Sequence, residues 1–140
     1  MPTPNILIIG DVMLDVYIDG EVKRRSPEAD VPVLSSTSAG TLRAGGAGNV
    51  AANVHSLGGR DIVITVMGYD SGSKDMPMSS DWLVTLDERP TTQKIRISDK
   101  GRPIARIDVE SEEPIDDQTT DAVLKRLYWA SRDAASCVTA

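Results

Sequence analysis

Two short stretches near the start of the chain carry residues that could bind a ligand. Asp11 and Asp15 follow a brief apolar run, and ionised carboxylates offer acceptor-only oxygens to several hydroxyl donors. Further along, Gly45 and Gly46 allow positive φ and a close approach of the backbone to a ligand, because they lack a Cβ. On pattern alone the plainer alternatives are as good: Asp11 caps a turn, Asp15 is solvated, and the glycines form only a tight turn.

A helix is expected directly after these glycines. From Asn49 onward the apolar residues Val50, Val54 and Leu57 recur at i, i+4 and i+7, and two glycines at 58–59 supply a left-handed stop. The free N–H groups of the helix N-terminus would then point at whatever lies over the glycines.

A hairpin at residues 93–109 carries a group of cations. Its two arms alternate polar and apolar residues, and residues 99–101 (DKG) form a candidate three-residue turn with Gly in the left-handed position. The expected register pairs Ser98 with Arg102, Arg96 with Ile104, and Lys94 with Arg106.

In that register Lys94 and Arg106 face each other on one side of the sheet. Two opposed cations are unfavourable unless an anion lies between them. The anion could belong to a ligand, or Asp108 could neutralise the pair diagonally. Both interpretations predict the same strand pairing, and both stay open.

Continuous and alternating apolar patterns predict two different sheets. Residues 6–9 (ILII) and 61–67 (DIVITVM) are almost wholly apolar, as in parallel strands covered on both faces. Residues 16–22, 31–34 and 93–109 alternate instead. We therefore expect an α/β fold with a small parallel sheet, flanking helices and a projecting β lid, and the 16–22 strand should not share a sheet with 6–9.

The remaining segments give weaker signals. Residues 71–80 (SGSKDMPMSS) are rich in turn formers, and residues 82–86 (WLVTL) are a candidate strand. A last helix should follow Pro114, with acidic residues in its first turn and basic residues toward its end. Its apolar face is expected to comprise Val123, Leu124, Leu127 and Tyr128 or Trp129.

Composition limits the classes of function. With 140 residues and 40% apolar content the chain can bury one core, so a single domain over residues 1–140 is expected. A formal net charge of -6 argues against a nucleic-acid partner. No apolar run has the length of a membrane span, and a lone Cys137 excludes an internal disulfide, which together favour a cytoplasmic protein. His55 is also single, so a His/Cys metal cluster is not expected.

The motifs resemble those of the ribokinase-like (PfkB) carbohydrate kinases. Residues 10–15 (GDVMLD) are similar to the first motif of that family, and residues 43–59 (RAGGAGNVAANVHSLGG) to its N-terminal signature. Residues 68–70 (GYD) are similar to its Gly-x-Asp. The segments 25–29 (RSPEA) and 92–96 (TQKIR) narrow the resemblance to bacterial heptose 7-phosphate kinases, although Asp30 departs from the usual proline of that branch.

The resemblance implies a fold and a set of site residues. The fold would be a truncated ribokinase-like parallel sheet with lid segments at about 16–35 and 91–110. Sugar hydroxyls would meet the loop and the asparagine, and the lid cations would serve a phosphorylated sugar. The implied substrate-binding residues are Asp11, Asp15, Gly45, Gly46, Asn49, Lys94, Arg96 and Arg106.

Complete members of the family also need a C-terminal motif, Asp-Thr-x-Gly-Ala-Gly-Asp, which supplies the anion hole and the catalytic base. These 140 residues contain no such motif. Kinase activity is therefore expected only with a complementary chain, which would bring ATP and Mg²⁺. The alternatives are a non-catalytic binding or assembly module built from a kinase half, and a mere fragment.

The family's lids commonly form a dimer interface. The resemblance therefore implies a homo-oligomer, most simply a two-fold dimer through the apolar face of the lid. That face would comprise Val16, Ile18, Ile95, Ile97, Ala105, Ile107 and Val109.

Overall fold

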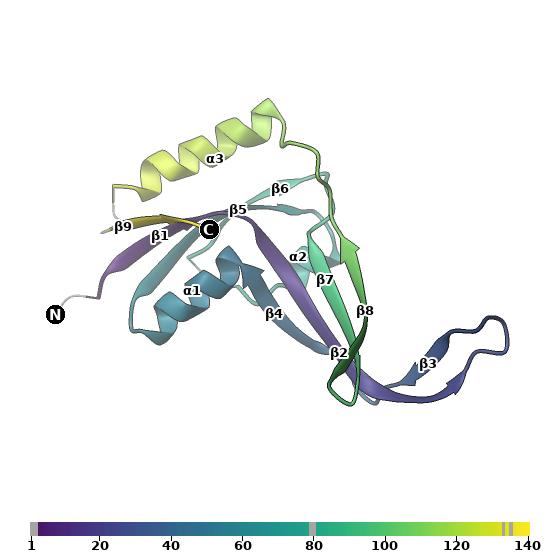
Figure 1. Cartoon of the computed structure of the whole chain (residues 1–140). Helices are drawn as coiled ribbons and strands as arrows, with labels where there is room; N and C mark the ends of the chain where they lie inside the picture. Colours follow the sequence, from purple (N-terminus) through teal and green to yellow (C-terminus); the bar gives the residue numbers. More distant parts are fainter. Residues whose placement is uncertain (1–2, 79–80, 133, 135) are drawn as a thin grey trace.

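The computed structural model describes residues 3–78, 81–132, 134 and 136–140 and has two sheets (Figure 1). Residues 79 and 80, the end of the turn-rich stretch, lie outside this description. In chain order the elements are β1 (Asn5–Ile9), β2 (Val12–Arg25), β3 (Pro32–Ser35), β4 (Thr41–Gly46), α1 (Ala47–Ser56), β5 (Arg60–Gly68), α2 (Ser71–Lys74), β6 (Leu83–Asp87), β7 (Gln93–Asp99), β8 (Arg102–Val109), α3 (Asp117–Ala130) and β9 (Ser136–Thr139).

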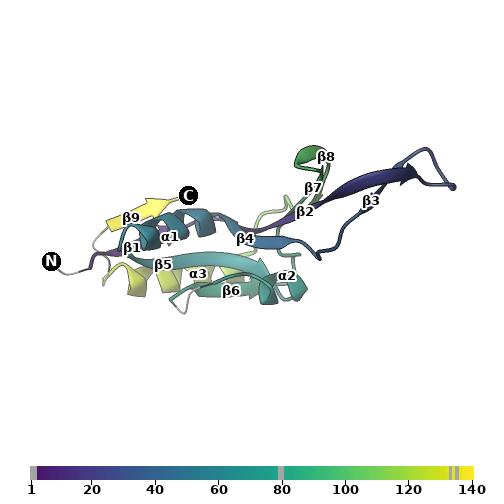
Figure 2. The same cartoon turned by 90° about the horizontal axis from the view of Figure 1, so that it is seen from below.

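The first sheet has four parallel strands in the order β6-β5-β1-β9. Its central strands β1 and β5 are the two continuous apolar runs, so the prediction of a parallel sheet with two covered faces is confirmed. Figures 1 and 2 show α1 on one face of this sheet and α3 on the other. The candidate strands at 82–86 and 134–140 are present as β6 and β9.

Each face of the sheet has its own core, because side chains alternate along a strand. On the α1 face, Ile8 and Val63 are fully buried and contact Ala47 and Ala51 of the helix. On the α3 face, Leu7 and Ile64 are fully buried and belong to a cluster with Ala130.

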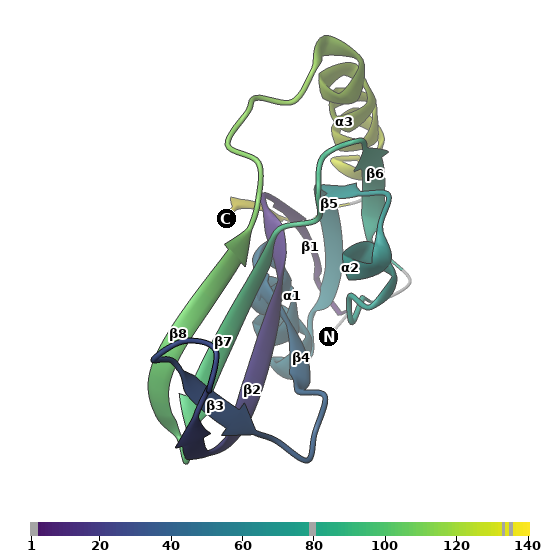
Figure 3. The same ribbon diagram turned by 90° about the vertical axis from the view of Figure 1, so that its right-hand side faces the viewer.

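The second sheet is the projecting lid, and its central strand is β2. One edge of β2 pairs in parallel with β7, which in turn pairs antiparallel with β8. The other edge pairs first with β4 and then, farther out, with β3. Figure 3 shows β4, β2, β7 and β8 side by side, with β3 at the far end. The 16–22 segment therefore lies outside the sheet of β1, as predicted, whereas β4 and the parallel pairing of β2 with β7 were not predicted.

The predicted register of the 93–109 hairpin is wrong. The turn has two residues, Lys100 and Gly101, both with positive φ (50° and 80°), and not three. Asp99 pairs with Arg102, and the register shifts once more between Ile97 and Ser98. As a result Lys94 lies opposite Asp108, and Arg96 lies opposite Arg106.

The helices also depart from prediction in their buried faces. In α1, Val50 and Val54 pack against the core as the periodicity predicts, but the buried residues are Ala47, Gly48 and Ala51. Leu57 is 88% exposed just beyond the helix end. The left-handed stop is confirmed, with Gly58 at φ 82°.

In α3, Val123 and Leu127 pack on the sheet as predicted. Leu124, Tyr128 and Trp129 are exposed instead, Trp129 by 64%. No basic residue lies in the last turn of α3. The 71–80 stretch is not wholly irregular, because its first four residues form the one-turn helix α2.

Candidate functional site

The site residues gather where β4 turns into α1. Gly46 is the residue before the helix and has φ 58° and ψ -130°, a conformation that favours glycine. A Cβ on Gly46 would lie 2.3 Å from the main-chain oxygen of Asp11. The same oxygen accepts a hydrogen bond of 2.9 Å from the N–H of Ala47. The helix N-terminus and the loop after β1 are thereby fixed against each other.

Gly45 makes room for the carboxylate of Asp15. In the pairing of β2 with β4, Gly45 lies opposite Met13, and a Cβ on Gly45 would lie 2.5 Å from Oδ2 of Asp15. Asp15 is thus part of strand β2, and only Asp11 lies in the loop where both carboxylates were expected.

Asp11 and Asn49 remain available to a ligand. Both residues are exposed, Asp11 in the loop between β1 and β2 and Asn49 in the first turn of α1. Within the part of the chain that the structure describes, neither side chain has a hydrogen-bond or ion-pair partner. A carboxylate and an amide in this state can both accept from hydroxyls, and the amide can also donate.

Arg96 binds Asp15 across the lid. Its Nη1 donates a hydrogen bond to Oδ1 of Asp15, and this bond raises the pKa of Arg96. The pair holds strand β7 against β2 at the level of the glycine turn.

The other two predicted cations form a network with two carboxylates. Nζ of Lys94 contacts Glu110 and lies 3.2 Å from Oδ2 of Asp108. The hydrogen bond to Glu110 contributes most to raising the pKa of Lys94, and the bond to Asp108 adds to it. Arg106 makes two hydrogen bonds to Asp108, of 2.7 and 2.8 Å, which raise the pKa of Arg106 and lower that of Asp108. Asp108 therefore pairs with both cations, but from directly opposite Lys94 and not diagonally across an opposed Lys94–Arg106 pair, as the plainer interpretation had it.

Sequence reasoning missed Tyr17 and Arg43 on the same face of the lid. Both the Arg43 and the Arg96 guanidinium lie over the Tyr17 ring, with Cζ 5.6 and 5.2 Å from its centroid. The alternation of Leu42 and Ala44 with polar neighbours was the signal that could have placed Arg43 on a strand.

A buried group of hydrogen bonds around Thr91 and Asp70 joins the parallel sheet to the lid. Thr91 is 1% exposed; its hydroxyl donates to Asp70 (2.7 Å) and accepts from the N–H of Gly68 (3.0 Å). Asp70 also accepts from the N–H groups of Thr91 and Ser73. Burial opposes ionisation of Asp70, but these hydrogen bonds outweigh it and lower the pKa of Asp70. These hydrogen bonds fix the start of β7, the strand that carries Lys94 and Arg96.

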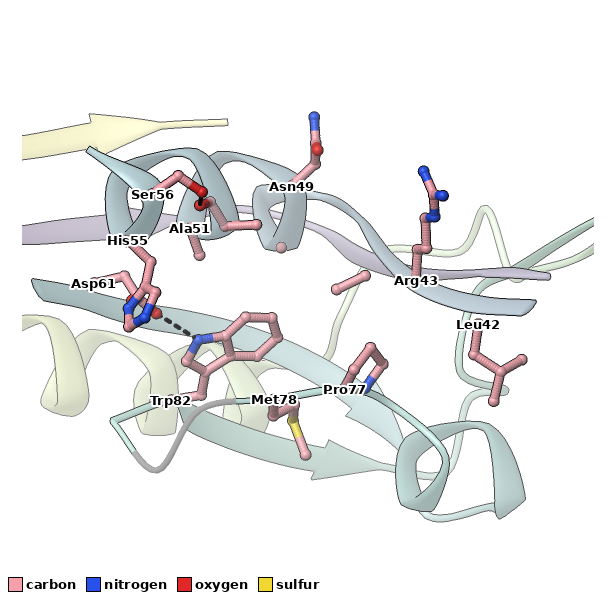
Figure 4. Close-up of a pocket in the computed structure, with 13 residues that line it drawn as sticks. Leu42, Arg43, Asn49, Ala51, His55, Ser56, Asp61, Pro77, Met78 and Trp82 are labelled. Carbon is pink, nitrogen blue, oxygen red and sulfur yellow. Dashed lines mark hydrogen bonds and ion pairs between the residues drawn. The ribbon is translucent and has the colours of Figure 1, made fainter. Parts of the chain in front are cut away.

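A cavity of about 700 Å³ adjoins the glycine turn, between α1, β4 and the segment before β6, and Arg43 and Asn49 are among its lining residues. Figure 4 shows Trp82, Met78 and Leu42 on this side of α1, whereas Asn49 and Arg43 point the opposite way. The indole N–H of Trp82 is already bonded to Asp61 at 2.9 Å. A sugar needs many polar partners, so the glycine turn suits one better than this mostly apolar hollow.

No three His, Cys, Asp or Glu side chains of the described ranges gather in a way that could hold a metal ion. No helix in those ranges is long and apolar enough to cross a membrane.

Solved structures show which class of protein has this fold. A ribokinase of Arabidopsis thaliana, complexed with ribose and ATP, matches 99% of this chain over 45% of its own length, with a TM-score of 0.61 and 18% identity. A possible 1-phosphofructokinase of Thermotoga maritima matches 96% of this chain over 44% of its own, with a TM-score of 0.64 and 17% identity. The two sheets and their helices are thus part of the ribokinase-like carbohydrate kinase fold.

Proteins of similar sequence show which family within this fold class the chain belongs to. The "Bifunctional protein HldE" of Rhodopseudomonas palustris (strain BisA53) is 37% identical over 140 residues, which cover 91% of this chain and 28% of the relative. HldE of Vibrio vulnificus (strain YJ016) is 41% identical over 111 residues, 75% of this chain and 23% of the relative. No protein-family model matches the chain. The chain belongs to the ribokinase-like (PfkB) carbohydrate kinases and spans about a quarter of the HldE proteins that it matches.

Proposed function

We propose that this chain supplies the sugar-binding half and the lid of an ATP-dependent kinase that acts on a sugar phosphate of the heptose 7-phosphate type. The observation that supports this most is the glycine turn. Gly45 lies against the Asp15 carboxylate and Gly46 against the Asp11 main chain, and the side chains of Asp11 and Asn49 have no partner among the described residues.

In this proposal each group has a separate task. Asp11 and Asp15 accept hydrogen bonds from sugar hydroxyls, and Asn49 both accepts and donates. The missing side chains at Gly45 and Gly46 let the Asp15 carboxylate and the Asp11 main chain lie close to the turn, which holds both aspartates near the sugar.

The lid cations Lys94, Arg96 and Arg106 lie on the phosphate side of the sugar. Each has a carboxylate partner in the structure, so a phosphoryl group would have to compete with these partners or bind beside them.

Phosphoryl transfer itself requires further parts. Its rate depends on positioning the donor and on neutralising charge around the transferred group. The anion-hole turn and catalytic base expected for the family do not occur in these 140 residues. ATP, Mg²⁺ and the base would therefore be supplied from outside these 140 residues, and the 140 residues by themselves should bind a sugar phosphate without turning over ATP.

Calorimetry with heptose 7-phosphate tests the binding site. We expect weak binding by the 140-residue chain, because half of the enclosing wall is absent. Asn49→Ala should weaken it by roughly tenfold, as expected for about 1–2 kcal/mol of lost hydrogen bonding. The matched control is Asn53→Ala, one turn later on the same helix, which should bind as the unmodified chain does. No heat from the unmodified chain, or equal effects of the two variants, would count against the proposal.

A second candidate function is a non-catalytic assembly module. The exposed apolar face of the lid favours it, with Ile107 49% and Val109 37% exposed. The calorimetric experiment distinguishes the two candidate functions, because an assembly module is expected to give no binding heat with heptose 7-phosphate.

A further inference from the structure

Arg43 differs from the other arginines and the lysine on the polar face of the lid. Lys94, Arg96 and Arg106 each have a carboxylate within ion-pair distance. Arg43 has none among the residues that the structure describes. Its nearest cross-strand neighbour is Asp15, but the carboxylate of Asp15 binds Arg96.

Arg43 is nevertheless held in place. It lies on β4, three positions before Gly46, and its guanidinium stacks over the Tyr17 ring with Cζ 5.6 Å from the centroid. The Arg96 guanidinium lies over the same ring at 5.2 Å. The two guanidinium groups carry like charges, and the nearby carboxylate of Asp15 forms its ion pair with Arg96 only.

Arg43 also lies close to the glycine turn. Arg43 and Asn49 both line the cavity that contains Trp82, and in Figure 4 the ends of their side chains point the same way, away from the Trp82 ring. The guanidinium fork matches the oxygens of a phosphoryl group with two parallel N–H donors, and it requires no carboxylate partner to be displaced.

We infer that Arg43, steadied by Tyr17, is the residue that binds the phosphoryl group of the sugar phosphate, with Arg96 as the second cation of that subsite. This inference rests on the proposed function and adds to it a phosphate-binding residue on β4. In the unliganded chain Arg96 is neutralised by Asp15 and Arg43 is not, so Arg43 supplies the positive charge that attracts the ligand.

Three probes and two variants test the inference. The probes are mannose 6-phosphate, mannose and inorganic phosphate, each titrated into the 140-residue chain by calorimetry. Arg43→Gln should weaken the binding of mannose 6-phosphate and of inorganic phosphate at least tenfold and leave the affinity for mannose unchanged. Arg24→Gln, which removes an exposed arginine from the far end of β2 and changes the net charge equally, should change none of them. If Arg43→Gln does not fold by circular dichroism, Arg43→Lys replaces it, with an expected loss of at least threefold.

The outcomes separate this inference from the function on which it rests. If Arg43→Gln loses affinity for mannose and mannose 6-phosphate equally, or loses none, the role of Arg43 is overturned and the proposed sugar site is not contradicted. Binding of inorganic phosphate that depends on Arg43, without binding of mannose, supports the subsite and contradicts the sugar-binding function. No binding of any probe by the unmodified chain overturns both.

Discussion

Replacing Ile97 and Ile107 together with glutamate is expected to convert a dimer of this chain into monomers. We propose a two-fold dimer that is formed by the apolar faces of two lids. The observed register places Ile97 opposite Ala105 and Ile95 opposite Ile107, so these side chains share one face with Val16 and Ile18. A carboxylate buried there without a partner costs several kcal/mol, and we expect the dissociation constant to rise at least about a hundredfold.

Light scattering and sedimentation at micromolar concentration measure this effect. The control is Arg106→Glu, which introduces the same side chain next to Ile107 but on the polar face, and it should leave the dimer intact. A monodisperse monomer for the unmodified chain would remove the proposal. A dimer that survives the double substitution would place the interface elsewhere.

Gly46→Ala is expected to have the largest effect on the stability of the fold. At φ 58° and ψ -130° the backbone is in a region that L side chains rarely adopt, and the new Cβ would lie 2.3 Å from the main-chain oxygen of Asp11. Strain of this kind costs about 1–3 kcal/mol, and the displaced Asp11 carbonyl adds to it. We expect the unfolding free energy to fall by about 3 kcal/mol in urea denaturation, with loss of sugar-phosphate binding.

Gly101→Ala separates the cost of the positive-φ backbone from the cost of the close contact with Asp11. Gly101 also has positive φ, 80°, but a Cβ there would meet nothing within 4 Å. It should cost only about 1 kcal/mol, the penalty of the left-handed conformation. If Gly46→Ala costs no more than Gly101→Ala, the close contact with Asp11 contributes nothing to the stability.

The faces of the lid could be predicted although its register could not. The predicted and observed pairings of Lys94, with Arg106 and Asp108 respectively, differ by two residues. Side chains alternate with a period of two, so this slip leaves the residues of 93–97 and 105–109 on the predicted face. Beyond the register shift the slip is one residue, because Ser98 pairs with Pro103 and not with Arg102, and there the predicted faces are exchanged. The sequence pattern does not distinguish a two-residue turn at Lys100 and Gly101 from a three-residue turn, because Asp, Lys and Gly suit both.

The helix faces were misjudged for a different reason. Apolar periodicity selected Leu57 in α1 and Leu124 in α3, yet both are exposed. The positions that touch the sheet are filled by small residues such as Ala51 and Ala130, because helix and sheet approach closely there. Small side chains carry little hydrophobic signal, so periodicity alone ranks them below leucine.

The motifs suggested site residues, whose role stays a prediction, but not the partners of these residues. Gly45 lies against the carboxylate of Asp15, and Gly46 lies against the main chain of Asp11. The pairing of Asp15 with Arg96 depends on the parallel contact of β2 with β7, a long-range arrangement with no local signature. Arg43 was overlooked because β4 was not predicted as a strand. Tyr17 lies on a predicted strand, but without β4 nothing placed it beside Arg43.

A titration of the ¹⁵N-labelled chain with heptose 7-phosphate tests the central claim most directly. If these 140 residues form the sugar-binding part of a kinase, the amide signals of Gly45, Gly46 and Asn49 should shift with one saturable constant. The indole signal of Trp82, on the other side of α1, should stay in place. Shifts confined to Trp82 and its neighbours, or no shift at all, would contradict a sugar site at the glycine turn.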